Sequence, residues 1–378
     1  MRKWLVVPVA ATMLFQVLPA HAAVKAATVA HVGDQCLRDG KVAPGRAIDG
    51  TDLVCMKATL GTSKGELLWW YSKLTPIKIF EIIAPIVSRN SDSPEVVASR
   101  SADRIGKAIG TALKNEELVK DYSSKNFSGG SGTWALGTFQ AYKNRLATSF
   151  IGSQTLIAGL ITTKSTLKLS DSKAIARLVQ EHEAIAVPAN SKYQTLEQLI
   201  NDLKNNPKAV TFIGGAAGGV DHIFMAKIFN SMNLDPKQAI YSPQNSGFDV
   251  ITKSLTDKSY VALSTSGDFV AQVTAGKMRI LGVASPEKLS WSKAKTLQQQ
   301  GVNVIYGNWY GIFVPPQFSD VDTSNFIHLL DVFHNSRIWL KTLSDNYWSE
   351  GYVGQKDFVA QIEVETAETK AILQQLGF

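Results

Sequence analysis

From Pro76 onwards, short runs of β-branched residues alternate with amphipathic segments, and this alternation limits the folds that the chain can adopt. The first run, residues 77–86, is followed by apolar residues at helical spacing, which predict a helix over residues 94–109. Further elements are predicted as helix 195–204, strand 209–213, helix 222–232, strand 239–241, strand 259–263 and helix 269–275. We therefore predict an α/β fold of mixed sheets, with ligand-facing loops at the strand ends.

The junctions between these elements are rich in Gly, Ser, Thr and Asn. Small residues let backbone amides approach a ligand, and amides at a helix start carry partial positive charge that suits a carboxylate. Turns also use such residues for their own geometry. Because the composition recurs at successive junctions, we favour a binding cleft. The loops are residues 88–93, 128–133, 152–155, 214–219 and 264–267.

The N-terminal residues have the order of a secretory signal peptide. The basic residues Arg2 and Lys3 precede an apolar stretch over residues 4–18, and the small-residue segment 20–22 follows. At about 15 residues, this stretch is shorter than the roughly 20 that cross a bilayer as a helix, which argues against an uncleaved anchor. We predict cleavage after Ala22 and export of a soluble protein to the periplasm or the extracellular space.

The composition is that of a globular protein large enough for two domains, with 378 residues, 45% of them hydrophobic and 19% charged. The formal net charge of +7 comes from scattered Lys and Arg residues. Scattered charge argues against nucleic acid as a partner and gives weak support to an anionic ligand or surface.

Residues 30–72 are predicted to form a small β-rich module. Cys36 and Cys55 are the two cysteines of an exported chain, so we expect them to form a disulfide. Asp49 and Gly50 have the composition of a tight hairpin turn. The three adjacent aromatic residues at 69–71 are interpreted as an apolar plug against the neighbouring domain, although a binding surface is the alternative.

Enzymatic activity has little support in the sequence. Ser131 and Ser246 lie next to glycine, but neither belongs to a Gly-x-Ser-x-Gly nucleophile elbow. The run Glu181-His182-Glu183 is interpreted as a solvated or interlobe charge cluster, because neighbours on a strand face opposite sides and no second His stands at zinc-site spacing. Residues 214–219 lack the glycine spacing of a dinucleotide site. We expect no catalytic residue, metal or cofactor.

Residues 77–378 resemble a known family, the periplasmic solute receptors of tripartite tricarboxylate transporters. The order and spacing of several segments carry the resemblance. They are residues 184–188, 193–199, 210–216, 221–222, 275–284 and 309–316.

The resemblance implies a type II periplasmic-binding-protein fold, with two α/β lobes, a cleft and two crossover strands. The segments would be a signal peptide (1–22), the disulfide-stapled module (30–72), lobe 1 (77–180 and 312–378) and lobe 2 (184–308). The crossover strands would lie near residues 177–187 and 306–315, and the solute would lie between the lobes, whose hinge closure a partner can detect.

The resemblance also implies ligand-binding residues in the junction loops. They are Ser88, Asn90, Ser91, Ser131, Gly132, Thr133, Ser153, Thr155, Gly215, Ala216, Ala217, His222, Ser264 and Thr265. The first loop departs from the family pattern, because Asp92 would repel an anion unless Arg89 or an amine of the ligand balances it. For His222, cleft-lining and structural roles remain equal alternatives, and Trp309 and Tyr310 are expected in the core rather than at the ligand.

The function that follows is an extracytoplasmic receptor, expected to be monomeric, that captures a small organic solute for the subunits of a membrane transporter. The solute is expected to be a carboxylate. The alternatives are a ligand sensor or a cell-envelope protein with the same fold, and a secreted hydrolase.

Overall fold

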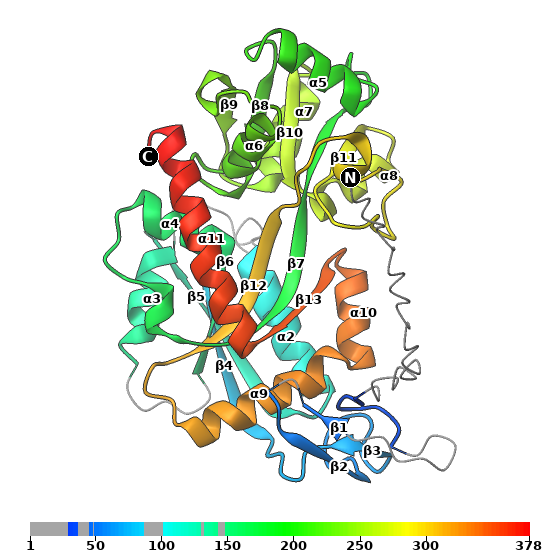
Figure 1. The fold of residues 1–378 in the computed structure, drawn as a ribbon, viewed down its shortest axis with the longest axis vertical. Coiled ribbons are helices and arrows are strands. Elements are labelled where there is room, and N and C mark those ends of the chain that lie inside the picture. The colour runs from blue at the N-terminus through cyan, green and yellow to red at the C-terminus, as the bar shows by residue number, and fades with distance from the viewer. Residues whose placement is uncertain (1–28, 37–44, 48, 87–100, 130–131, 143–147) are drawn as a thin grey trace, which may run out of the picture.

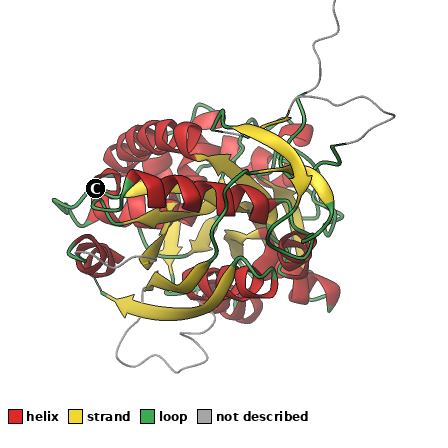
Figure 2. Cartoon of the chain, turned by 90° about the horizontal axis from the view of Figure 1, so that it is seen from below, coloured by secondary structure: helices red, strands yellow, loops and turns green. Residues whose placement is uncertain are grey.

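The computed structural model describes residues 29–36, 45–47, 49–86, 101–129, 132–142 and 148–378. Two α/β lobes lie one above the other, and a small β module lies below them (Figure 1). Seen from below, helices surround the strands on more than one side (Figure 2). The predicted fold class is therefore confirmed. Among these described residues, no helix has both the length and the apolar character needed to cross a bilayer.

The sheet of the lower lobe combines parallel and antiparallel strands. β4 (Ile77–Ile86) lies between β5 (Val119–Ser128) and β6 (Thr148–Ser153), and all three are parallel. β12 (Gly307–Val314) then pairs antiparallel with β6 and with β7 (Lys173–Pro188), and β13 (Ser349–Gly354) pairs with β7.

The sheet of the upper lobe continues from the second half of β7. β10 (Tyr260–Thr265) and β11 (Met278–Val283) pair antiparallel with β7, while β8 (Thr211–Gly214) and β9 (Ile240–Pro243) extend the sheet in parallel from β10. β7 pairs with β12 up to His182 and with β10 from Glu183 onwards, so one strand serves both lobes. A site between the lobes is therefore built on a continuous strand.

Helices cover both sheets. In the lower lobe they are α2 (Ser101–Asn115), α3 (Thr133–Gln140), α4 (Gln154–Thr162), α9 (Asp320–His334) and α10 (Arg337–Asp345). In the upper lobe they are α5 (Leu196–Asn205), α6 (Val220–Ser231), α7 (Gly247–Thr256) and α8 (Val270–Thr274). Thr195 and Gln198 form a capping box that starts α5 where the sequence predicts it.

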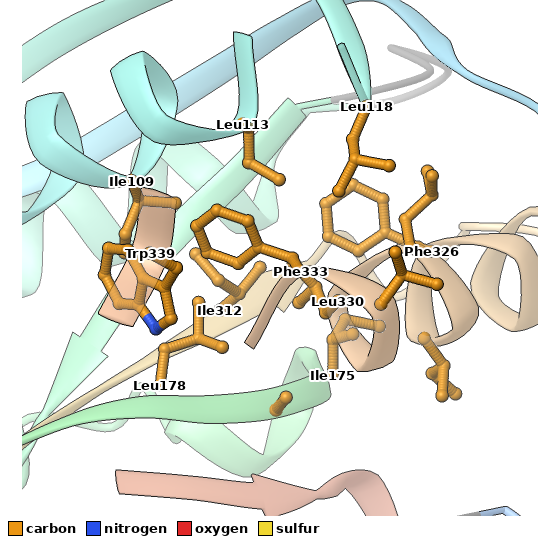
Figure 3. Packing of buried hydrophobic residues seen from close by; sticks show 14 of the residues in the cluster. Ile109, Leu113, Leu118, Ile175, Leu178, Ile312, Phe326, Leu330, Phe333 and Trp339 are labelled. Atoms are coloured by element: carbon orange, nitrogen blue, oxygen red, sulfur yellow. The ribbon is translucent and has the colours of Figure 1, made fainter. Parts of the chain in front are cut away.

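The helix predicted over residues 94–109 differs from α2 at its end. Residues 94–100 lie outside the described residues, and α2 continues to Asn115. The predicted end at Ile109 was wrong because Ala112 and Leu113 continue the buried face. Together with α9 and α10, this face packs against Ile175 and Ile312 of the sheet (Figure 3).

The C-terminal helix α11 (Gln355–Leu376) runs from the lower lobe to the upper one (Figure 1). Phe358 and Ile362 are buried in the core of the lower lobe. Towards its end, the helix contacts α6, where Lys227 pairs with Glu368 at 3.3 Å. The helix therefore contacts both lobes, and Val364 in its middle is 59% exposed.

The N-terminal module is a three-stranded sheet of β1 (Gly45–Arg46), β2 (Asp52–Lys57) and β3 (Leu67–Trp70). The predicted disulfide between Cys36 and Cys55 is present, with the two Cα atoms 5.4 Å apart. Gly50 has a φ of 87° in the turn between β1 and β2, which favours glycine.

The three aromatic residues of the module are buried, which confirms the apolar plug. Trp69, Trp70 and Tyr71 are 6%, 2% and 1% exposed within the core that the module shares with the lower lobe. The Tyr71 hydroxyl donates to Asp331 Oδ2 of α9 at 2.5 Å, and the Tyr71 ring stacks on His328 at 3.9 Å. The module is thus fixed to the lobe by a buried polar network as well as by apolar contact.

We expect replacement of both cysteines by serine to destabilise the module by about 2–3 kcal/mol, because the disulfide closes a short loop in the unfolded chain. Hydrogen exchange should show faster opening of β1–β3, with unchanged protection in β8 and β10 of the distant lobe. Equal loss of protection in both places would show instead that the module supports the whole chain.

Candidate functional site

A cavity of about 400 Å³ lies between the lobes, where strand ends meet helix starts. The residues of the lower lobe that line it are Pro85, Ser101, Ala102, Arg104, Ser153, Thr155, Asn308 and Tyr310. Those of β7 and the upper lobe are Glu183, Gly215, Ala216, Gly219, Val220, Asp221, Asn245, Ser246, Gly247, Phe248, Ile251, Ser264, Thr265 and Asp268. A larger hollow of about 1010 Å³ lies between the N-terminal module and α9–α10, away from the junction loops.

Helix N-termini converge on the cavity from both lobes. Ser153 caps α4, where its hydroxyl accepts from the Leu156 amide at 3.2 Å, and the Thr155 amide donates to Asn308 Oδ1 at 3.2 Å. In the upper lobe, α6 begins after Gly219 and α7 begins after Ser246. Helix starts carry partial positive charge, so this part of the cavity favours an anionic group.

The glycine-rich loop before α6 is held by its neighbours. The Gly215 amide donates to Asp221 Oδ2 at 2.5 Å, and the Tyr241 hydroxyl donates to the Gly215 carbonyl at 2.8 Å. The Gly218 amide donates to His222 Nδ1 at 3.0 Å, and the His222 ring stacks on Tyr241 at 4.1 Å. Burial lowers the pKa of His222 to about 4, so its ring is neutral and can accept this bond.

Acidic side chains gather on the β7 and upper-lobe side of the cavity. Glu183 is 0% exposed, and its carboxyl lies close enough to that of Asp221 to interact with it. Burial and the neighbouring acids raise the pKa of Asp221 to about 7 and raise that of Glu183 well above its ordinary value. Asp268 faces the same group and accepts from the Ser264 hydroxyl at 2.7 Å.

Arg104 is the one basic side chain among the described residues that line the cavity. Its guanidinium pairs with Glu181 at 3.3 Å and lies 5.3 Å from the centre of the Trp348 ring. Burial raises the pKa of Glu181 to about 7 despite this pairing. Arg104 Nε has no hydrogen-bond partner among the described residues.

The structure brings together only part of the predicted site. The predicted residues that line the cavity are Ser153, Thr155, Gly215, Ala216, Ser264 and Thr265. Those that do not line it are Gly132, Thr133, Ala217 and His222. Ser88, Asn90, Ser91 and Ser131 lie outside the described residues. A Cβ added at Gly132 would lie 3.2 Å from Pro85 Cβ, so Gly132 allows the chain to pass close to this lining residue. His222 supports the glycine loop by accepting from the Gly218 amide.

The sequence reasoning missed other lining residues, among them Arg104, Phe248, Asp268, Asn308 and Tyr310. Asp268 lies just past the predicted loop 264–267, so a loop extended by one residue would have included it. Asn308 lies within the predicted crossover strand 306–315, where no ligand-binding residue was expected. Trp309 and Tyr310 are buried, as expected, but Tyr310 also lines the cavity. Arg104 carries no local signal, because it lies inside a helix.

Residues 181–183 do not form a solvated charge cluster, which was one of the two interpretations of this run. Glu181 and Glu183 are 4% and 0% exposed and lie where β7 passes from one lobe to the other. His182 points to a different hollow, one that it shares with Arg177 and Glu365, as expected for alternate faces of a strand. In the part of the chain that the structure describes, no group of three or more His, Cys, Asp or Glu residues could hold a metal ion.

The fold and the cavity define a two-lobed solute-binding protein, and the comparisons with known proteins agree. Residues 156–378 match the family described as "Tripartite tricarboxylate transporter family receptor". The chain belongs to this family, which confirms the resemblance seen in the sequence. Receptors of this family are periplasmic and bind solutes rather than catalysing a reaction. A comparison with curated proteins gives no match.

Solved structures share the fold at low sequence identity. A TctC solute-binding protein from Polaromonas, without ligand, has a TM-score of 0.64 at 17% identity, over 80% of this chain and 99% of that chain. An R. palustris protein with adipate has a TM-score of 0.64 at 16% identity, over 80% and 98%. MatC from Rhodopseudomonas palustris with malate has a TM-score of 0.59 at 12% identity, over 79% and 100%. About a fifth of this chain has no counterpart in the structures that it matches.

Proposed function

We propose that this receptor is exported through its first 22 residues and binds a small organic carboxylate between its lobes. It would deliver this solute to the membrane subunits of a tripartite tricarboxylate-type transporter. The observation that carries the proposal is the convergence of Arg104 and the starts of α4, α6 and α7 on one cavity. Malate and adipate, bound by proteins of the same fold, are solutes of suitable chemistry.

The same proposal includes the arrangement expected from the sequence. Cleavage would follow Ala22, lobe 1 would comprise residues 77–180 and 312–378, and lobe 2 would comprise residues 184–308. A monomer suffices for binding, because both walls of the cavity come from one chain.

A thermal-shift screen of residues 23–378 against mono-, di- and tricarboxylates, amino acids and neutral aromatic compounds tests the proposal. A solute that binds only the folded state at a hundredfold excess over its Kd stabilises it by about 2.7 kcal/mol, enough to raise Tm by a few degrees. We expect Arg104→Gln to weaken binding of any carboxylate hit about 10- to 100-fold, because a charge-assisted hydrogen bond is lost.

Lys288→Gln is the matched control, since Lys288 is exposed and does not line the cavity. Each variant is compared with and without solute, so that a change in its own stability does not enter the result. The proposal is wrong if no compound bearing a carboxylate raises Tm, or if Arg104→Gln and Lys288→Gln bind it equally well.

A further inference from the structure

The β7 and upper-lobe side of the cavity is poorly suited to a second carboxylate of a solute. Glu183, Asp221 and Asp268 line it, while the one basic lining residue among the described ones, Arg104, comes from the lower lobe. A dicarboxylate with one end at Arg104 would place its other end near these acids. Like charges at short range in a partly buried site repel strongly.

Several polar atoms of this cavity also lack a partner. Apart from the neighbouring Asp221 carboxyl, the oxygens of Glu183 have no hydrogen-bond partner among the described residues, although the side chain is completely buried. Thr265 Oγ1 and Arg104 Nε, which belong to two other lining residues, are likewise buried without partners. Buried polar groups are normally paired, so these atoms suit a ligand that has both donors and an acceptor.

An ammonium group matches the acidic side of the cavity. It carries positive charge and up to three N–H donors, with no acceptor that would oppose the carboxylates. A metal ion would also neutralise the acids, but the described residues contain no group of three or more side chains placed to bind one. At the other side, the positive charge of Arg104 and the start of α4 suit a carboxylate.

We propose that the solute is an amino carboxylate, with its ammonium group at Asp221 and Asp268 and its carboxylate towards Arg104 and the start of α4. Glu183 lines the same side of the cavity, next to Asp221. The inference rests on the proposed function and narrows it from carboxylates in general to solutes that carry both charges.

Matched pairs of solutes test the subsite directly. Aspartate is compared with succinate, and glutamate with glutarate, by calorimetric titration of the wild-type protein. We expect the amino-bearing member of a pair to bind about 10- to 100-fold more tightly, as charge-assisted hydrogen bonds to a carboxylate imply. Butylamine, which has an ammonium group and no carboxylate, tests that group alone.

Asp268→Asn and Asp221→Asn identify the residues responsible. Each is expected to remove most of the preference for the amino-bearing solute, while the pair member that lacks the amino group binds as before or more tightly. Glu197→Gln is the control, because Glu197 is an exposed acid of the same lobe on α5 and does not line the cavity. The wild-type comparison still decides the question if either variant fails to fold.

The outcomes separate this inference from the function on which it rests. Equal or tighter binding of succinate and glutarate would overturn the ammonium subsite and leave the carboxylate receptor intact. A preference for aspartate or glutamate that survives both Asp variants would also overturn it. Binding of butylamine alone would support the subsite and contradict the carboxylate proposal, whereas binding of no compound at all would contradict both.

Discussion

Replacement of Gly307 by alanine is expected to destabilise the protein by about 4 kcal/mol or more and to abolish solute binding. Gly307 begins β12, where this strand pairs with His182 of β7 between the lobes. An added Cβ would overlap the Glu181 carbonyl oxygen and lie 2.8 Å from the Cα of His182. Overpacking usually costs about 1–3 kcal/mol, but here the obstacle is backbone, which cannot turn aside.

The effect should reach the cavity because both strands contribute to it. Asn308, the next residue of β12, lines the cavity and accepts from the Thr155 amide at the start of α4. Glu181, on the opposing strand, holds Arg104. A displacement of β12 from β7 would therefore separate the groups that are proposed to bind the solute.

Urea unfolding and calorimetric titration of the variant provide the measurement. Gly137→Ala is the control, because Gly137 lies inside α3 and its added Cβ would meet only Leu167 Cδ1, at 3.3 Å. The control variant should be as stable as the wild type, or more stable by up to about 1 kcal/mol, because alanine has the higher helix propensity. If Gly307→Ala stayed within about 1 kcal/mol of the wild type and bound solute normally, the close pairing of β7 and β12 would not be essential.

The elements that the sequence predicted are those with local signals. The start of α5 follows from Thr195 and Gln198, which lie within four residues of each other. Ser153, Gly215 and Ser264 were found as cavity residues because each lies at the end of a strand, in a loop of small polar residues. Local spacing was sufficient in these cases, since strand ends are where α/β folds bind ligands.

The features that were missed depend on partners distant in the sequence. Glu181 is buried because Arg104 and Trp348, far away along the chain, both contact it. The face that Arg104 presents depends on how α2 packs on the sheet. The reach of α11 into the upper lobe depends on Lys227 and Asn230 of α6, which pair with Glu368 and Gln375. None of these pairings can be recognised from the residues next to either partner in the sequence.

The acids of the cavity make stability depend on pH in a direction that can be worked out. Burial raises the pKa of Asp221 from 3.8 to about 7, so the folded state keeps a proton that the unfolded state releases above about pH 4. Stability from this group is fully present below pH 3.8 and is lost as the pH rises towards about 7. Glu183 also makes the protein less stable as the pH rises, because burial and the neighbouring acids raise its pKa. Glu181 has the same effect on stability, because burial raises its pKa to about 7.

Two histidines have the opposite effect on stability over much of the same pH range. Burial lowers the pKa of His182 and of His222 from 6.5 to about 4, so the unfolded state binds protons that the folded state does not. Their contribution to stability therefore grows as the pH rises from about 4 to 6.5. The pH profile of the wild type alone would mix the two effects, whereas the difference between the wild type and a variant of one acid cancels the histidines.

We expect Asp221→Asn to gain stability relative to the wild type by about 4 kcal/mol between pH 4 and pH 8, since each pKa unit corresponds to about 1.4 kcal/mol. Asn can still accept the Gly215 amide, so the loop keeps its hydrogen bond while the buried charge is removed. Urea unfolding of both proteins at several pH values, without solute, measures this difference. A difference that did not change with pH would show that Asp221 ionises as easily in the folded chain as in the unfolded one. An ammonium group bound by the wild type should stabilise the charged form of Asp221, so saturating amino carboxylate should reverse part of the variant's advantage at pH 8.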